Sequence, residues 1–204
     1  MTNVTETNLP RWIQSRCQDL SQEIPQDILW VSIPEQRLRH YHNQDLEHVY
    51  TISTSKAPPS CIENSFGTPT GMHIVADKIG EGANAGTIFE SRVPTRHVSD
   101  LSPDEQRKNY VTTRIMRMRG LEPGHNAGPG RDTYDRYVYI HGTNHPERIG
   151  KPFSGGCVEL NEPRFLRSDN NNSKINPETA DSGIGPLPHP RVGCFPLNRT
   201  KTHG

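Results

Sequence analysis

Residues 137–161 read YVYIHGTNHPERIGKPFSGGCVELN, and this stretch decides how the chain is interpreted. An apolar, alternating run leads into His141, and a Ser-Gly-Gly turn then precedes Cys157. A thiol reacts as its thiolate, which forms near neutral pH when an imidazole or a set of backbone N–H groups stabilises it. The stretch therefore predicts a cysteine nucleophile, Cys157, with His141 as its base.

The turn before the cysteine is the second feature of this stretch. Gly155 and Gly156 allow backbone conformations that other residues avoid, so the N–H groups around the sulfur can converge on one point. Converging N–H groups can hold the oxyanion of an acyl-transfer intermediate. The alternative for Cys157 is a structural thiol, because free cysteines are among the most buried residues.

A metal site is the competing interpretation of the histidines. His141 and His145 are four residues apart, and Glu147 and Cys157 follow them. On a helix this spacing would place both imidazoles on one face. The glycine and proline within the segment and the strand-like residues before it favour a non-helical path, and the close Cys or His pairs of zinc sites are absent. We therefore predict no metal site.

Taken together, the strand ending in His-Gly-Thr-Asn and the Ser-x-Gly-Cys element resemble the signature of the L,D-transpeptidase catalytic domain. Members of that family cross-link bacterial peptidoglycan through an acyl-cysteine. Upstream segments are similar to the opening strands and the Thr-Pro-x-Gly turn of that domain: residues 28–33, 36–41, 49–53 and 67–74. The resemblance implies a mainly β fold, an L,D-transpeptidase-like mixed β-sandwich with an N-terminal helix and few short helices.

The resemblance also implies roles for individual residues. Cys157 corresponds to the nucleophile and His141 to the base, which the backbone carbonyl of Gly142 orients. Ser154 and Gly156 shape the turn and, with Gly155, the oxyanion-binding amides. No cofactor is implied, and the partners are peptidoglycan stem peptides.

Two positions depart from the family's pattern. The family usually has His where this chain has Gly155, and Arg or Asn where it has Glu159. The change at Gly155 removes a donor beside the nucleophile, and Glu159 adds a negative charge that disfavours a thiolate. The implied activity is an L,D-transpeptidase in cell wall cross-linking. The alternatives are an L,D-carboxypeptidase, in which water resolves the thioester, and a catalytically impaired wall-binding module.

Composition limits the other function classes. The 204 residues carry a formal net charge of zero, so no global basic field attracts nucleic acid. Only 30% of the residues are hydrophobic, and 18 Pro and 17 Gly are typical of a loop-rich β domain. No apolar run approaches the ~20 residues that cross a bilayer. The oligomeric state is not specified by the sequence.

The resemblance and the first residues of the chain give different predictions for the cellular compartment. The resemblance implies the cell envelope or periplasm, whereas the first thirty or so residues show no basic start and apolar core of a secretory signal. Cysteine usage leaves the disulfide state open, because the four cysteines are widely spaced: Cys17, Cys61, Cys157 and Cys194.

Three parts of the chain are predicted. Residues 1–26 form an N-terminal extension, in which the spacing of apolar residues after Asn8 and Pro10 predicts an amphipathic helix over 9–22. Residues 168–204 are rich in Pro and poor in apolar residues, which predicts a disordered or divergent tail that lacks the family's closing strand.

The catalytic domain is predicted over residues 27–167. Its strands follow from runs of apolar and β-branched residues bounded by turn residues. They are expected within 27–53 and at 72–76, 111–119 and 136–140, with a Gly-Pro-rich connection over 120–131 and a short helix at 162–167.

Overall fold

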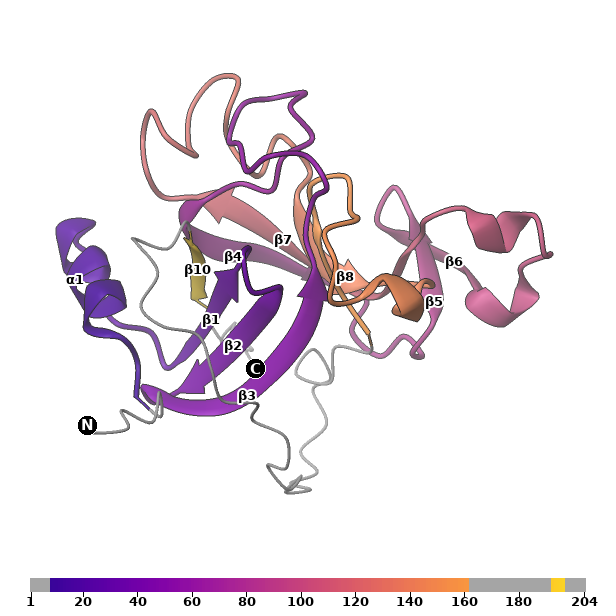
Figure 1. The fold of residues 1–204 in the computed structure, drawn as a ribbon, viewed down its shortest axis with the longest axis horizontal. Coiled ribbons are helices and arrows are strands. Elements are labelled where there is room, and N and C mark those ends of the chain that lie inside the picture. The colour runs from indigo at the N-terminus through magenta and orange to yellow at the C-terminus, as the bar shows by residue number, and fades with distance from the viewer. Residues whose placement is uncertain (1–7, 162–191, 197–204) are drawn as a thin grey trace, which may run out of the picture.

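The computed structural model describes residues 8–161 and 192–196, shown in colour in Figure 1. These residues form a mainly β fold, as predicted, and their 10 strands make one mixed sheet. The single α-helix of this part of the chain is α1 (Arg11–Asp19), and three short 3-10 helices follow at Val98–Asp100, Glu105–Arg107 and Pro146–Arg148. The strands are β1 (Asp27–Ser32), β2 (Arg37–His42), β3 (Asp45–Ser53), β4 (Gly71–Ile79), β5 (Thr87–Glu90), β6 (Val93–His97), β7 (Val111–Gly120), β8 (Tyr139–Gly142), β9 (Val158–Leu160) and β10 (Val192–Pro196).

The sheet curls round until it meets itself. Its strand order is β4-β10-β1-β2-β3-β9-β8-β7-β5-β6, and β4 also pairs with β7. The strands from β4 to β7 in this order therefore close into a ring, and β5 and β6 extend from β7 to the right in Figure 1. Most pairs are antiparallel, whereas β8–β9 and β4–β10 are parallel.

One apolar core fills the interior of this ring. Its members come from almost every strand and alternate with residues that face outward, as the two-residue period of a strand requires. They are Leu29, Val31, Leu38, Ile52, Val75, Met116, Met118, Val138, Ile140, Val158 and Leu160. Because β8 and β9 contribute apolar residues to this core, their alternate residues point away from it.

Helix α1 covers the outer face of β1 and β2. Ile13 and Cys17 are buried in a second apolar cluster, which includes Trp30 of β1. The predicted helix is confirmed, but it is shorter than expected and Asn8 does not cap it. Asn8 instead pairs with Asp45, and the backbone enters the helix through Pro10 without a side-chain cap. The helix is held by packing, as is usual for a helix of this length.

The predicted strands within 27–53, at 72–76 and at 111–119 are confirmed, but the strand at 136–140 starts late. Strand β8 begins only at Tyr139, because Arg136 and Tyr137 before it do not take part in the strand. Tyr137 adopts φ +55°. The Arg136 guanidinium reaches the loop between β3 and β4, where it donates to the carbonyls of Ser60 at 3.0 Å and Gly67 at 2.9 Å.

The expectation that no strand closes the sheet is wrong. Strand β10 pairs antiparallel with β1 and parallel with β4, so it joins two strands that would otherwise each keep an open edge. The predicted helix at 162–167 and the rest of the predicted tail lie outside the described residues. Among the residues that are described, no helix has the length and apolar character needed to cross a membrane.

Candidate active site

The parallel pairing of β8 with β9 sets the geometry of the site. His141 lies opposite Glu159 in this register, and residues two apart on a strand share a face. Tyr139 and His141 of β8, with Cys157 and Glu159 of the segment around β9, therefore lie on the face that points away from the ring core. A small cluster that includes Ile115 of β7 covers part of this face and contacts Cys157.

Within the described residues, the hydrogen-bonding contacts of the Cys157 thiol are to backbone groups. The N–H of Tyr139 donates to Sγ at 3.3 Å, and Sγ lies 3.8 Å from the carbonyl of Tyr137. Burial raises the pKa of Cys157 to about 12, which outweighs the lowering by the Tyr139 N–H. The negative charge of Glu159 contributes to this rise in the pKa, and the cation of Arg136 opposes it. The resting thiol is therefore protonated at neutral pH.

The imidazole of His141 is buried and held by one hydrogen bond. Its Nδ1 lies 2.7 Å from the carbonyl of Gly142, which can only accept, so Nδ1 carries the proton and Nε2 is the acceptor. Burial lowers the pKa of His141, while Glu159 and the Gly142 carbonyl raise it. The contact to Gly142 that the resemblance implied is thus present. Within the described residues, no hydrogen bond joins His141 to Cys157.

The Ser-Gly-Gly turn is fixed by the hydroxyl of Ser154. Oγ donates to the carbonyl of Cys157 at 2.6 Å and accepts from the N–H of Gly156 at 3.2 Å. Gly156 adopts φ +131°, and a Cβ there would lie 3.4 Å from the carbonyl oxygen of Phe66. Gly155 has open space around a Cβ and no such φ. Only Gly156 therefore requires glycine, and its N–H is engaged by Ser154 in the resting site.

Glu159 is buried beside both candidate catalytic groups. Its Oε1 accepts from Nδ2 of Asn109 at 2.7 Å, and its Oε2 has no hydrogen-bond partner among the residues that the structure describes. One carboxylate thus acts on two neighbours: it makes a thiolate at Cys157 less favourable and an imidazolium at His141 more favourable.

Comparison with known proteins identifies the family of this chain. The family model of the YkuD L,D-transpeptidase catalytic domain matches residues 26–167, which is more than half of the chain. The chain belongs to the L,D-transpeptidase catalytic domain family. No protein of curated function matches the chain.

Solved structures of L,D-transpeptidases are similar to this one at low sequence identity. An L,D-transpeptidase from Mycobacterium smegmatis is 15% identical with a TM-score of 0.32, and the match covers 67% of this chain and 49% of that one. L,D-transpeptidase 3 from Mycobacterium tuberculosis is 16% identical with a TM-score of 0.39, and the match covers 69% and 54%. The chain thus spans about half the length of these proteins.

Some residues of this L,D-transpeptidase domain site could not be singled out from the sequence. The Tyr139 N–H, the Asn109 amide and the Arg136 guanidinium all act on the site through the fold. None carries a motif, because each is placed by strand pairing or by a distant loop. His145, considered as a metal ligand, turns to Glu147 with Nδ1 at 2.8 Å. The described part of the chain contains no group of three or more His, Cys, Asp or Glu residues suited to a metal ion.

Proposed function

We propose that this chain is an L,D-transpeptidase that acts on peptidoglycan stem peptides through an acyl-cysteine at Cys157. One observation carries the proposal: the parallel β8–β9 pair sets Cys157 and His141 on one face, with the Tyr139 N–H on the sulfur. Work on peptidoglycan would place the protein in the cell envelope.

The first half of the reaction forms the thioester. Nε2 of His141 takes the proton of Cys157, and the sulfur attacks the carbonyl of an L-to-D peptide bond in the stem. The N–H groups of Cys157 and Gly156 hold the oxyanion. The Gly156 N–H first gives up its hydrogen bond to the Ser154 hydroxyl. The C–N bond then breaks, and the proton on His141 passes to the departing amine of the D-residue.

The second half releases the stem onto an acceptor. An amine of a second stem attacks the thioester carbonyl, His141 takes the amine's proton, and the C–S bond breaks to return the thiolate, which recovers that proton. Water in place of the amine would give an L,D-carboxypeptidase, with the same residues in the same roles.

The site rests neutral and becomes charged only during reaction. Burial raises the pKa of Cys157 and lowers that of His141, so at neutral pH the pair is a thiol and an imidazole. Proton transfer then creates two charges in a low-dielectric setting, which the Tyr139 N–H and Glu159 stabilise at opposite ends. A contact of this kind that strengthens as the charges form contributes about tenfold to a hundredfold in rate.

A wall-binding module is the second candidate. Two observations favour it: no hydrogen bond joins His141 to Cys157 within the described residues, and Glu159 opposes the thiolate. Such a protein would keep the fold and bind peptidoglycan without forming a thioester.

Intact-mass analysis distinguishes these functions. The protein is incubated with a stem tetrapeptide and, separately, with a carbapenem, whose strained amide acylates a nucleophile. We expect one covalent adduct that maps to Cys157 and disappears in Cys157→Ala, with an unchanged circular dichroism spectrum. Cross-linked stems indicate amine acceptors, and shortened stems indicate water. An adduct that persists in Cys157→Ala contradicts the assignment, and binding to peptidoglycan without any adduct supports the wall-binding module.

A further inference from the structure

Two loops far apart in the sequence bring a second cysteine and a histidine into contact. The loop between β3 and β4 carries Cys61, and the loop after β7 carries His125; both lie at the top of Figure 1. Sγ of Cys61 lies 3.7 Å from Nε2 of His125, although 64 positions separate them. The proposed mechanism uses neither residue.

A buried asparagine fixes this contact. Nδ2 of Asn126 donates to the carbonyls of Thr70 at 2.9 Å and Met72 at 3.0 Å, and its Oδ1 accepts from the N–H of Glu122 at 2.9 Å. The asparagine is wholly buried and ties the second loop, directly after His125, to the end of the first loop and the start of β4. The imidazole is therefore held against Cys61 by the backbone of its own neighbours.

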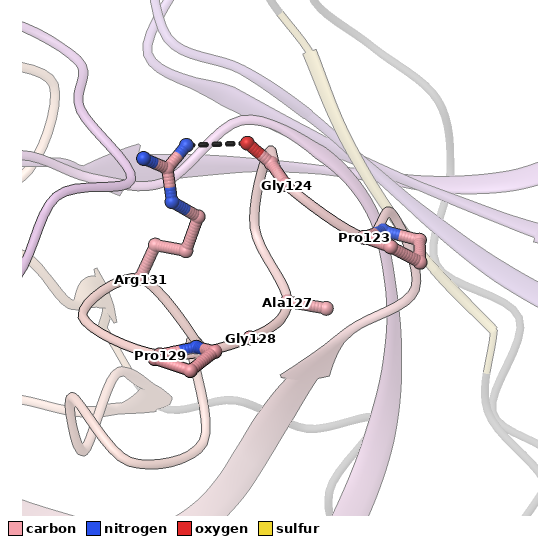
Figure 2. A pocket seen from close by; sticks show the side chains of 6 residues that line it. All are labelled: Pro123, Gly124, Ala127, Gly128, Pro129 and Arg131. Atoms are coloured by element: carbon pink, nitrogen blue, oxygen red, sulfur yellow. Dashed lines mark hydrogen bonds between the residues drawn. The ribbon is translucent and has the colours of Figure 1, made fainter.

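Two further features define the shape of the second loop. Gly71 adopts φ +93°, and a side chain there would overlap the Glu122 carboxylate, so the loops can approach only because this residue is glycine. Farther along, the loop closes on itself around a shallow apolar hollow, and Figure 2 shows the Arg131 guanidinium donating to the Gly124 carbonyl. His125 thus lies on a closed loop anchored to its neighbour.

The groups around Cys61 suit a reactive thiol. Nε2 of His125 lies 3.7 Å from Sγ and 3.2 Å from the Thr70 hydroxyl, so it can take the thiol proton directly or through that hydroxyl. The N–H of Thr70 donates to Sγ at 3.5 Å, and Sγ lies 3.6 Å from the Thr70 carbonyl. Oε2 of Glu122 lies 3.8 Å from the same Nε2, so a carboxylate stands beside the ring. Arg136, which donates to the neighbouring Ser60 carbonyl at 3.0 Å, interacts electrostatically with Cys61.

The remaining charged groups nearby do not oppose this arrangement. Glu122 also pairs with Arg16 of α1 at 2.6 Å, so its carboxylate is held in place. His73 lies near His125, but burial lowers the pKa of His73 to about 3, so it adds no positive charge at neutral pH. Cys17 offers a contrast within the same molecule: it lies on the buried face of α1, and burial raises its pKa.

We propose that Cys61 is a second reactive thiol, a modification site for small hydroperoxides that works independently of Cys157. The Cys61 thiolate attacks one oxygen of the peroxide: an S–O bond forms, the O–O bond breaks, and the leaving oxygen takes the proton held by His125. The sulfur is oxidised by two electrons to a sulfenic acid, and the peroxide is reduced to water or an alcohol. Cys61 is 7% exposed beside a half-exposed His125, so the site admits small oxidants rather than stem peptides.

Residue-resolved oxidation tests the proposal. The protein is treated with hydrogen peroxide and a sulfenic-acid trap, and each cysteine is quantified by peptide mass spectrometry at about pH 7 and about pH 10. We expect Cys61 to be trapped at least about tenfold faster than Cys17 at the lower pH. His125→Gln should slow Cys61 about tenfold at the lower pH and much less at the higher one, where a thiol ionises unaided. His48→Gln, a surface change on β3, is the control and should alter neither rate.

The outcomes separate the proposal from a structural role. Equal trapping of Cys61 and Cys17 in the wild-type protein overturns it, and that comparison holds even where the His125 variant is poorly folded. A folded His125→Gln protein with an unchanged pH dependence also overturns it, since a merely structural histidine would leave that dependence intact. Retention of the Cys61 signal in Cys157→Ala shows that the two thiols act separately.

Discussion

The two cysteine–histidine pairs of this protein differ in what holds them. Cys157 and His141 are placed by strand pairing, and each is bonded to backbone rather than to the other. Cys61 and His125 are placed by loops, and they touch. A sheet fixes two groups at a set separation, which leaves room for a substrate between them. A loop contact allows a proton to move at rest, which suits a site that meets a small oxidant.

Replacing each of the two histidines by alanine, one at a time, gives the strongest test of this difference. His141→Ala should slow alkylation of Cys157 by about tenfold to a hundredfold near neutral pH, and less as the pH rises toward the Cys157 pKa of about 12. The direction follows because the thiolate fraction then grows without a base. His125→Ala should leave Cys157 unaffected. Residue-resolved alkylation rates from about pH 7 to about pH 10 measure both effects, and equal slowing at all pH values would assign His141 a structural role.

Alanine substitutions at two adjacent glycines test whether the pair of Cys157 and His141 depends on the Ser-Gly-Gly turn. Gly156→Ala forces a side chain into φ +131° beside the Phe66 carbonyl, so it should lower the free energy of unfolding by about 1–3 kcal/mol and reduce acylation of Cys157. Gly155→Ala has open space and should change either quantity little. Thermal melting and carbapenem acylation rates check the pair, and matching losses in both variants would show that the turn has no special requirement at Gly156.

The smallest expected effect comes from the buried carboxylate. Glu159→Gln keeps an acceptor for Asn109 and removes the charge that raises the pKa of Cys157. The pKa of Cys157 should therefore fall, and direct alkylation at about pH 9 should rise by up to about tenfold. Acylation by a carbapenem near neutral pH should fall, because the same change removes support for the His141 imidazolium. A parallel rise in both rates would mean that the carboxylate only hinders the site.

Most of the strands could be predicted because their evidence is local. The segments 27–53 and 111–119 alternate or concentrate apolar residues, and both proved to line the ring core. The start of β8 could not be predicted. Arg136 and Tyr137 look strand-like, but Arg136 donates to a loop some seventy positions earlier, and Tyr137 adopts a positive φ. Strand β10 was missed for a related reason: it is short, and its backbone is held by pairing with β1 and β4.

The residues of the candidate site also divide into those with a local sequence motif and those without one. Cys157, His141 and the turn around Ser154 carry a motif, and the structure brings them to one face of adjacent strands. The amide of Tyr139 has no signature, because any residue could supply an N–H there. The contact between Cys61 and His125 has none either, because its two halves come from separate loops that only the folded sheet brings together.

Strand β10 also gives the fold an order of assembly. It lies between β1 and β4, although both precede it by most of the described chain. The ribosome therefore delivers two strands with unpaired edges long before it delivers the strand that they share. Pairing over so great a distance forms slowly, and open edges meanwhile attract other chains. Until the ribosome has made β10, the nascent protein therefore depends on its open strand edges being shielded from other chains.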